Sequence, residues 1–307
     1  MPRFVEQLSF DTKLFDLSIG RIDLSEKDCE LLLKYPTIHD ILGHANSAGY
    51  RCIYTFAPVL KAGESVQLNS NGKPKYEFLG ERFDIKTVYC ALLTKFDRES
   101  ALRMAFHVPD HKHIRIRKYE ESKMCNDFPN AVEELKELAV ASGGHSRFKI
   151  DKNLPEEGFV GMFHAWLANS LNHAIADELF VAYDTELSNR IVGFITVKRK
   201  ELNVNIGLLS VASSHRRKGI AYSLLSRALL WALEEIGWAE EATMNVATQG
   251  ANGPACTCYE RFGFSLQHTQ DVYHCWLPEH LEKESRSDTT LIPFCRQYFT
   301  GKVRDHH

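Results

Sequence analysis

SVASSHRRKGIAYSLL, residues 210–225, joins a predicted strand to a predicted helix and decides the fold. Over residues 203–211 apolar side chains alternate along the chain, which is the period of a strand, whereas over residues 221–236 they recur at helical spacing. Gly237 then stands where a left-handed residue commonly ends a helix. Between strand and helix lie three consecutive cations and Gly219. Backbone N–H groups, the helix dipole and side-chain charge therefore converge on one loop, which predicts an anion site, most simply for a pyrophosphate.

The spacing within this loop narrows the choice of anion. Gly219 leaves room for a phosphate oxygen against the backbone, and the small Ala221 lets the helix begin close to the ligand. The pattern is neither that of a nucleoside-triphosphatase loop nor that of a dinucleotide-binding turn, so both classes are disfavoured. Taken alone, the stretch is equally compatible with a solvated Arg-Arg-Lys turn or a nuclear-localisation-like patch.

Length and composition describe an ordinary globular protein. The chain has 307 residues, 44% of them hydrophobic and 25% charged, which suits one large domain or two smaller ones. A net charge of -3 argues against a nucleic-acid or anionic-membrane partner, and no apolar run approaches the roughly 18 residues of a spanning helix. The N-terminus lacks the pattern of a secretion signal. The eight cysteines form neither a zinc-site nor a redox spacing, so we expect a reducing cytoplasm.

The remaining sequence alternates predicted strands with predicted helices, which indicates a layered fold of helices and sheet. Strands are predicted at residues 19–22, 51–56, 84–94, 108–118, 179–183, 190–199, 242–248 and 272–277. Helices are predicted at residues 38–48, 131–140, 161–171 and 254–262, and an exposed hairpin or flap at 61–75. Asn252 suits the N-cap of the last of these helices and Gly263 its end.

Two motifs together resemble the acetyl-CoA elements of the GNAT superfamily of N-acetyltransferases. The first is Arg216-x-x-Gly219-x-Ala221, and the second is Asn252-x-x-Ala255-x-x-x-Tyr259-x-x-x-Gly263-Phe264. Asn252 and Tyr259 are seven positions apart, so both project from nearly the same face of a helix. The alternative reading of this helix by itself is a capping Asn followed by a half-buried aromatic.

Further landmarks resemble the branch of this superfamily that acetylates dTDP-fucosamine (dTDP-4-amino-4,6-dideoxy-D-galactose). They are Leu8-x-Phe10-Asp11-Thr12-x-x-Phe15 with Arg21, Ser146-Arg147-Phe148-x-x-Asp151, Trp166-x-x-x-Ser170-Leu171, Ala176-Asp177, Ala247-Thr248-Gln249 and Tyr273-His274-x-Trp276-Leu277. The resemblance covers nearly residues 1 to 277. The sequence departs from the branch at four positions: Phe10 replaces Trp, Asp16 and Arg217 each stand where the branch has Gly, and Ala221 replaces the last loop Gly.

The resemblance implies an α+β GNAT fold, with a mixed central sheet flanked by helices and a GNAT-like α/β part before it. Residues 1–145 would recognise the acceptor, and residues 146–278 would form the catalytic domain that binds acetyl-CoA. Residues 279–307 would form a charged linker and a tail. Within the tail, residues 292–302 resemble the opening of pyridoxal-phosphate sugar aminotransferases, although a chance ordered tail explains so short a match as well.

The same resemblance implies which residues hold the cofactor and which act on it. Acetyl-CoA would contact Leu209, Val211, Arg216, Arg217, Lys218, Gly219, Ile220, Ala221, Tyr222 and Asn252. Tyr259 would act as general acid toward the departing thiolate, and backbone N–H groups of residues 209–211 would polarise the thioester carbonyl. No metal is needed.

Two roles stay open between alternatives. The general base is a water chain or one of His164, His173 and His215, each of which is also readily explained as a structural or surface histidine. Arg147 would pair with a phosphate of the sugar nucleotide, or else form a structural ion pair with Asp151.

The expected function is transfer of an acetyl group from acetyl-CoA to the amine of a nucleotide-linked amino-deoxysugar, of the dTDP-4-amino-4,6-dideoxyhexose class. Such an acyltransferase would serve surface-polysaccharide precursor synthesis in the cytoplasm, and a homodimer is left open. The alternatives are an acetyltransferase that modifies a protein N-terminus, a lysine or a small amine, and a non-catalytic module that binds CoA.

Overall fold

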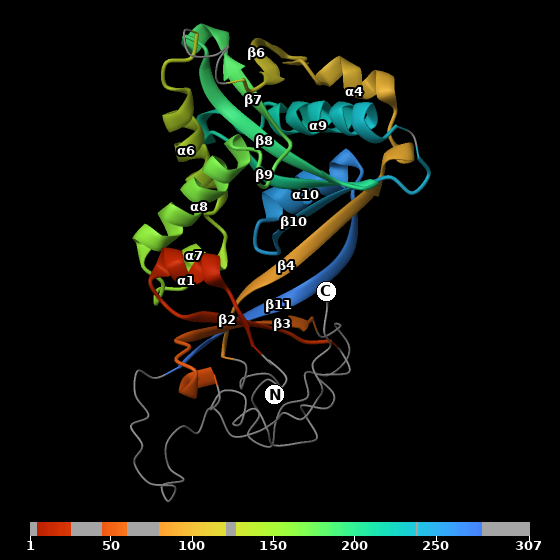
Figure 1. The fold of residues 1–307 in the computed structure, drawn as a ribbon. Helices are drawn as coiled ribbons and strands as arrows, with labels where there is room; N and C mark the ends of the chain where they lie inside the picture. Colours follow the sequence, from red (N-terminus) through yellow and green to blue (C-terminus); the bar gives the residue numbers. More distant parts are fainter. Residues whose placement is uncertain (1–4, 26–44, 60–79, 121–126, 238, 278–307) are drawn as a thin grey trace, which may run out of the picture. The chain divides into compact units, whose positions relative to one another are not determined.

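A computed structural model describes residues 5–25, 45–59, 80–120, 127–237 and 239–277. By its contacts the chain divides into two compact units, one of residues 1–86 and 269–307 and the other of residues 87–268 (Figure 1). Most of the helix predicted at 38–48, the flap at 61–75 and the tail at 279–307 lie outside the described residues. Residues 87–145 pack with those up to 268, and the assignment of acceptor recognition to residues 1–145 stays a prediction.

The described part of the first unit contains four strands and a short helix, together with the opening of a further strand. In chain order they are β1 (Glu6–Gln7), α1 (Ser9–Phe15), β2 (Ile19–Asp23), β3 (Cys52–Pro58), the opening of β4 (Glu81–Leu92) and the second half of β11 (Ser265–Trp276). β1 and β2 are antiparallel, β2 and β3 are parallel, and β3 and β11 are antiparallel. The strand predictions at 19–22, 51–56 and 272–277 are thereby confirmed.

Local chemistry explains how the first unit begins. The helix α1 ends at Asp16, whose φ of 52° lies in the left-handed region that favours glycine. The hydroxyl oxygen of Thr12 accepts a hydrogen bond from the N–H of Ile19 at 3.0 Å and so ties the helix to β2.

The pairing of β3 with β11 brings two aromatic rings together. His274 on β11 stacks on Tyr54 of β3 with ring centroids 4.2 Å apart.

The second unit is a mixed sheet with helices packed on it. Its elements are the remainder of β4, α4 (Arg98–Met104), β5 (His107–Val108), β6 (His111–Lys118), α6 (Ala131–Ser142), α7 (Arg147–Ile150), α8 (Glu156–Leu171), β7 (Glu178–Asp184), β8 (Arg190–Lys200), β9 (Asn203–Val211), α9 (Ile220–Ile236), β10 (Thr243–Gln249) and α10 (Gly253–Phe262). Single 3₁₀ turns η2 (Leu93–Lys95), η3 (Thr185–Leu187) and η4 (Ser213–His215) complete it.

The strand order within this unit is β4-β10-β9-β8-β7-β6-β5. β9 and β10 run parallel, whereas each pair from β5 to β9 is antiparallel. The strand predicted over 203–211 has the observed bounds of β9, and the predicted α+β class is confirmed.

The core of this unit lies between the sheet and α9, which packs on β7, β8, β9 and α4 (Figure 1). The helical spacing seen in the sequence is the buried stripe of α9, whose side chains are at most 1% exposed at Leu224, Leu225, Ala228, Leu229 and Ala232. Gly237 ends the helix as predicted, but its φ of 78° and ψ of -163° differ from the left-handed helical conformation that was expected. A helix α6 packs on β8 and β9, and against α8.

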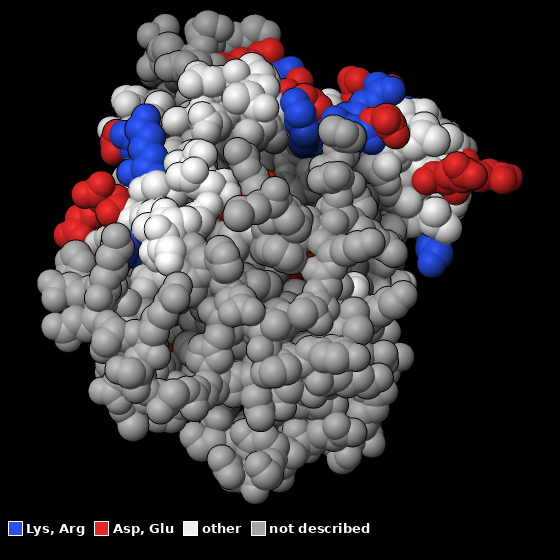
Figure 2. Space-filling model, turned by 60° about the horizontal axis from the view of Figure 1, so that its bottom comes forward, with Lys and Arg blue, Asp and Glu red and all other residues white. Residues whose placement is uncertain are grey.

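The surface of the described residues carries charges of both signs. Figure 2 shows Lys and Arg side chains beside Asp and Glu side chains on one face, rather than a field of one sign. Among the described residues, no helix combines the length and the apolar composition that crossing a membrane requires.

Candidate active site

Strands β9 and β10 separate before β9 ends. Their parallel pairing runs from Asn203 opposite Thr243 to Ile206 opposite Val246. β9 continues to Val211, and over residues 209–211 its pairing runs on along β8. Within the described part of the chain, the last residues of β9 are therefore unpaired on the side of β10, and we call this stretch of unpaired strand edge the gap.

Backbone N–H groups of β9 point into this gap. Ala212 donates its N–H to the carbonyl oxygen of Val192 at 2.8 Å, and Leu208 donates to the hydroxyl oxygen of Thr196 at 2.8 Å, where the β8–β9 register shifts. Because N–H groups alternate in direction along a strand, those of Leu209 and Val211 point away from β8. Leu209 and Val211 are the two residues of this strand that the family resemblance implied as contacts of acetyl-CoA.

The loop that follows β9 presents its cations to solvent. Arg216 and Arg217 are exposed and Lys218 is half-buried. Arg216 donates from Nε to the carbonyl oxygen of Val211 at 3.2 Å, which folds the loop back onto the strand end. The first N–H groups of α9 follow directly, and the helix has no side-chain cap at Gly219. The cationic side chains and the first helix N–H groups are thus adjacent along the chain, and their binding of an anion stays a prediction.

Two residues of the loop occupy the left-handed region of backbone space. Gly219 has a φ of 83°, and a Cβ placed there would meet only Val108 Cγ1 at 3.5 Å, so the backbone angle rather than crowding explains the glycine. Arg217 has a φ of 65°. Arg217 therefore holds a backbone angle that favours glycine, the residue of the branch that the sequence resembles, at a cost of about 1 kcal/mol.

Asn252 and Tyr259 both belong to α10, which packs against α9. Asn252 is the N-cap: its Oδ1 accepts the N–H of Ala255 at 3.3 Å, and Gly263 ends the helix with a φ of 118°. Both caps were predicted. Among the described residues no hydrogen bond occupies the Asn252 Nδ2, which remains a donor.

Tyr259 is buried, with its ring 6.0 Å from that of Tyr89 and 5.8 Å from that of Phe264. Burial, with smaller contributions from Cys258 and Cys256, raises the pKa of Tyr259 well above its usual range. A phenol is protonated at neutral pH even at its usual pKa near 10, and a raised pKa makes it a weaker acid. Tyr259 is therefore in the protonation state that a general acid needs.

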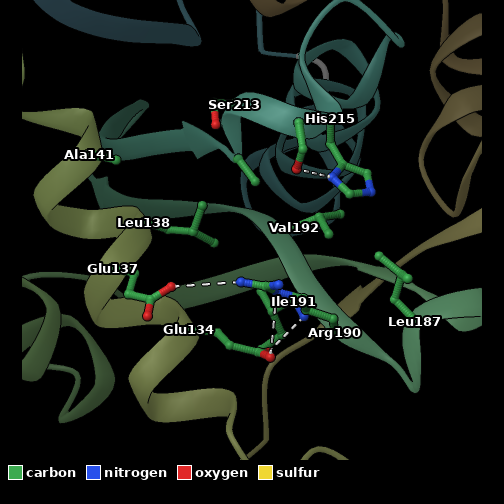
Figure 3. A pocket seen from close by; sticks show the side chains of 12 residues that line it. Glu134, Glu137, Leu138, Ala141, Leu187, Arg190, Ile191, Val192, Ser213 and His215 are labelled. Carbon is green, nitrogen blue, oxygen red and sulfur yellow. Dashed lines mark hydrogen bonds and ion pairs between the residues drawn. The ribbon is translucent and has the colours of Figure 1, made fainter.

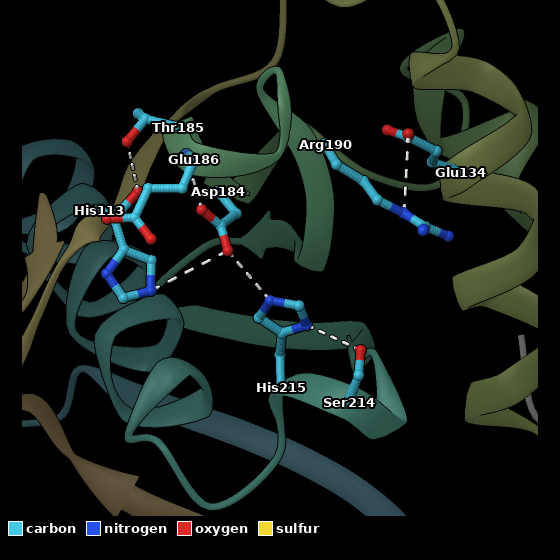
Figure 4. Close-up of polar contacts among 8 residues, drawn as sticks. All are labelled: His113, Glu134, Asp184, Thr185, Glu186, Arg190, Ser214 and His215. Carbon is cyan, nitrogen blue, oxygen red and sulfur yellow. Dashed lines mark hydrogen bonds and ion pairs between the residues drawn. The ribbon is translucent and has the colours of Figure 1, made fainter.

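The histidine candidates for the base differ in their surroundings. His215 is buried in η4, with Nε2 3.2 Å from Asp184 Oδ2 and Nδ1 2.8 Å from Ser214 Oγ (Figure 4). Both of its ring nitrogens are engaged, which favours a structural role. His173 is exposed, with Nδ1 3.0 Å from the carbonyl oxygen of Asp177, and His164 is half-buried on α8. None of these contacts assigns the base.

Arg147 opens α7, and its guanidinium lies 4.1 Å from the ring centroid of Phe148. Asp151, its suggested ion-pair partner, accepts hydrogen bonds at Oδ1 from the backbone and side-chain nitrogens of Asn153 at 2.9 and 3.1 Å. The choice between phosphate pairing and an ion pair with Asp151 is thus left as a prediction.

A pocket of about 360 Å³ adjoins the start of the loop (Figure 3). Its wall is formed by α6, the beginning of β8 and residues 212–215. Arg190 lies 3.9 Å from Glu134 and 3.8 Å from Glu137, and Glu134 also accepts the N–H of Ile191 at 2.8 Å. This pocket could not be predicted from the sequence, because its charged residues come from separate predicted elements and match no motif.

Comparison with known proteins identifies the part of the chain that contains these features. Residues 176–266 match the family model described as "Acetyltransferase (GNAT) domain". This segment runs from the residues before β7 to the beginning of β11. It contains all the predicted cofactor residues and Tyr259.

Two curated proteins are similar to parts of the chain. The spore coat polysaccharide biosynthesis protein SpsD of Bacillus subtilis is 26% identical over 148 residues, which are 48% of this chain and 48% of that protein. A streptothricin acetyltransferase of Escherichia coli is 32% identical over 92 residues, 30% of this chain and 51% of that protein. The chain thus spans about half the length of the curated relatives it matches.

One solved structure shares the fold over most of the chain. A conserved protein of unknown function from Staphylococcus epidermidis aligns with a TM-score of 0.54 and 13% identity, covering 89% of this chain and 92% of that one. The family match and the splayed β9–β10 pair agree with the α+β GNAT fold that the motifs implied. The chain therefore carries a GNAT acetyltransferase domain at residues 176–266, and the expected superfamily and fold are confirmed for this domain.

Proposed function

We propose that this chain transfers an acetyl group from acetyl-CoA to the amine of a nucleotide-linked amino sugar, of the dTDP-4-amino-4,6-dideoxyhexose class. The observation that carries the proposal is the gap beside β9, where two backbone N–H groups face an open strand edge that leads into a cationic loop. GNAT acetyltransferases use acetyl-CoA, and donors in the gap would suit its thioester while the cationic loop would suit its pyrophosphate.

The residues of the gap and loop fit acetyl-CoA, which would supply an acyl group activated as a thioester. The loop from Arg216 to Tyr222 would bind the pyrophosphate through its cations and the first N–H groups of α9. The N–H groups of Leu209 and Val211 would polarise the thioester carbonyl, and the Asn252 amide would donate to the pantetheine arm. Tyr259, which like any phenol is protonated at neutral pH, would give its proton to the departing sulfur. The transfer as proposed uses no metal ion.

The acceptor is proposed from two lines of support. One curated relative is a spore coat polysaccharide biosynthesis protein, which agrees with the sugar-nucleotide acceptor that the sequence landmarks implied. Residues 1–145 would recognise that acceptor, and Arg147 would pair with one of its phosphates. The other relative is a streptothricin acetyltransferase, which favours a small amine as the second candidate acceptor.

The purified full chain, incubated with acetyl-CoA and a panel of acceptors, tests this proposal. The panel contains dTDP- and UDP-linked 3- and 4-amino-6-deoxysugars, streptothricin and a lysine peptide, with the corresponding hydroxy-sugar nucleotides as controls. We expect release of the CoA thiol and a product one acetyl group heavier only with an amino-sugar nucleotide. If only streptothricin or only the peptide is acetylated, the proposed sugar-nucleotide acceptor is wrong. If acetyl-CoA binds tightly and no acceptor is acetylated, the chain is a CoA-binding module.

Arg147→Ala tests the acceptor contact separately. The KM for the sugar nucleotide should rise while the KM for acetyl-CoA stays nearly constant, because only one partner loses a contact. If both constants are unchanged and only the unfolding temperature falls, Arg147 is structural.

A further inference from the structure

Four side chains of types that commonly bind metals lie close together beside the loop of the candidate site (Figure 4). No sequence motif predicted this cluster. His113 comes from β6, Asp184 ends β7, Glu186 lies in η3, and His215 lies in η4. One ligand atom each from His113, Asp184 and Glu186 lies within 4.8 Å of the others.

Asp184 is the centre of this cluster. Its side chain is 6% exposed, and its Oδ2 lies 3.2 Å from His215 Nε2 and 4.0 Å from His113 Nε2. Its Oδ1 accepts the N–H of Glu186 at 2.9 Å. Among the described residues, the ion-pair partners of Asp184 are these two imidazoles, which carry charge only when protonated. A buried carboxylate is costly unless it is both hydrogen-bonded and paired with an opposite charge, and a bound cation would supply that charge.

We propose that His113, Asp184 and Glu186 bind a divalent transition-metal ion, most simply Zn²⁺. One imidazole and two carboxylates form a donor set that zinc accepts, with water in the remaining position. Ligand atoms around tetrahedral zinc are about 3.4 Å apart, so the 4.0 Å between His113 and Asp184 must shorten by about half an ångström. Glu186 is exposed and adjusts by rotation.

The backbone around the cluster is already tied together. The hydroxyl of Thr185 donates to the carbonyl oxygen of His113 at 3.0 Å, which fixes η3 against β6. β6 and β7 are paired up to Ile114 opposite Asp184. Two of the three ligands therefore stand on neighbouring strands, and the third lies one turn beyond.

The metal would act on the anion loop through His215. A carboxylate that binds zinc commonly also accepts a hydrogen bond from a neighbouring group, which orients both. Here the neighbour is His215 Nε2, and Arg216 of the loop follows it directly. A metal bound here would join β6 to η3 and, through His215, to η4, and would hold the segment from which the loop starts. This inference does not rest on the proposed acceptor.

Calorimetric titration of ZnCl₂ into the full chain, stripped of metal with a chelator and dialysed, tests the site. Wild type is compared with Glu186→Gln and His113→Asn, and with His145→Asn, an exposed histidine outside the cluster, as matched control. We expect one saturable zinc site per chain in wild type. Its affinity for zinc should be at least tenfold weaker in both cluster variants and unchanged in the control. Glu186→Gln changes an exposed side chain, so folding should be preserved, and circular dichroism checks it.

Titration with Co²⁺ identifies the donors. Ligation by nitrogen and oxygen gives d–d absorption without thiolate charge transfer, and this absorption should weaken in Glu186→Gln. The proposal is overturned if wild type shows no saturable site, if the cluster variants bind zinc as wild type does, or if the bound cobalt shows thiolate charge transfer.

Discussion

The Oδ1 atom of Asn252 accepts a hydrogen bond from the backbone N–H of Ala255 at 3.3 Å. This single contact caps α10, the helix that carries Tyr259. It uses the carbonyl side of the amide and leaves the NH₂ side as a donor. Asn252 thus satisfies a structural role and a binding role with different atoms, so the two can be tested separately.

Replacing Asn252 by Asp or by Ala separates capping from binding. Asp keeps an oxygen for the cap and loses the NH₂, whereas Ala loses both. We expect Asn252→Ala to lower the free energy of unfolding by about 1 kcal/mol and Asn252→Asp to leave it nearly unchanged. Both variants should weaken acetyl-CoA binding, measured by calorimetry. Full affinity in Asn252→Ala would show that the residue is only a cap.

The left-handed angle at Arg217 predicts an asymmetry between two neighbouring glycine substitutions. Arg217→Gly relieves the strain at a φ of 65°, whereas Lys218→Gly removes a cation without that relief. Measured by chemical denaturation, the free energy of unfolding of Arg217→Gly should be about 1 kcal/mol higher than that of Lys218→Gly. Equal stabilities of the two variants would mean that the loop does not hold this angle in solution.

Asp177 gives a pH-dependent contribution to stability. Burial alone would raise its pKa, but Lys198 Nζ at 2.6 Å and the Arg199 N–H at 2.7 Å outweigh burial, so the pKa is lowered. A lowered pKa adds stability above the unfolded value near 3.9, which disappears as the pH falls through the folded value. Asp177→Asn should therefore cost about 0.5–1 kcal/mol at pH 7 and nothing at the acid end of the stability profile. A constant difference at all pH values would contradict this.

Tyr259→Phe removes one hydroxyl and keeps the ring and its packing. If this hydroxyl protonates the thiolate, kcat should fall by about a hundredfold or more while acetyl-CoA affinity changes little. Tyr89→Phe is the matched control, because its ring neighbours that of Tyr259 but its hydroxyl donates to Glu260 at 2.9 Å. A fall of only a few-fold in Tyr259→Phe would show that solvent protonates the sulfur.

Features encoded over a few neighbouring residues could be predicted from the sequence. The bounds of β9, the buried stripe of α9 and the caps at Asn252 and Gly263 follow from spacing and from glycine chemistry. Strand ends were predicted less accurately where the side chains are exposed, because exposed residues need not alternate between apolar and polar. β11 begins at Ser265 rather than residue 272, because its first four residues are exposed and show no apolar alternation.

Features that depend on distant pairing could not be predicted. The gap beside β9 exists because its pairing with β10 ends at Ile206, which is a property of sheet register. The contact of Asp184 with His215 joins residues 31 positions apart, and no local period encodes it. The loop residues could be named from the sequence because they are contiguous, but the surroundings that set the pKa of Tyr259 could not.

The measurement that tests the central claim most directly is calorimetric titration of acetyl-CoA into wild type, Gly219→Gln and Gly219→Glu. The two variants have side chains of equal size and carry the same backbone cost at a φ of 83°. They differ by one negative charge at the start of α9. If the loop binds the pyrophosphate, Glu should weaken binding at least tenfold more than Gln does, because like charges repel at close range. Equal affinities in the Glu and Gln variants would contradict the account.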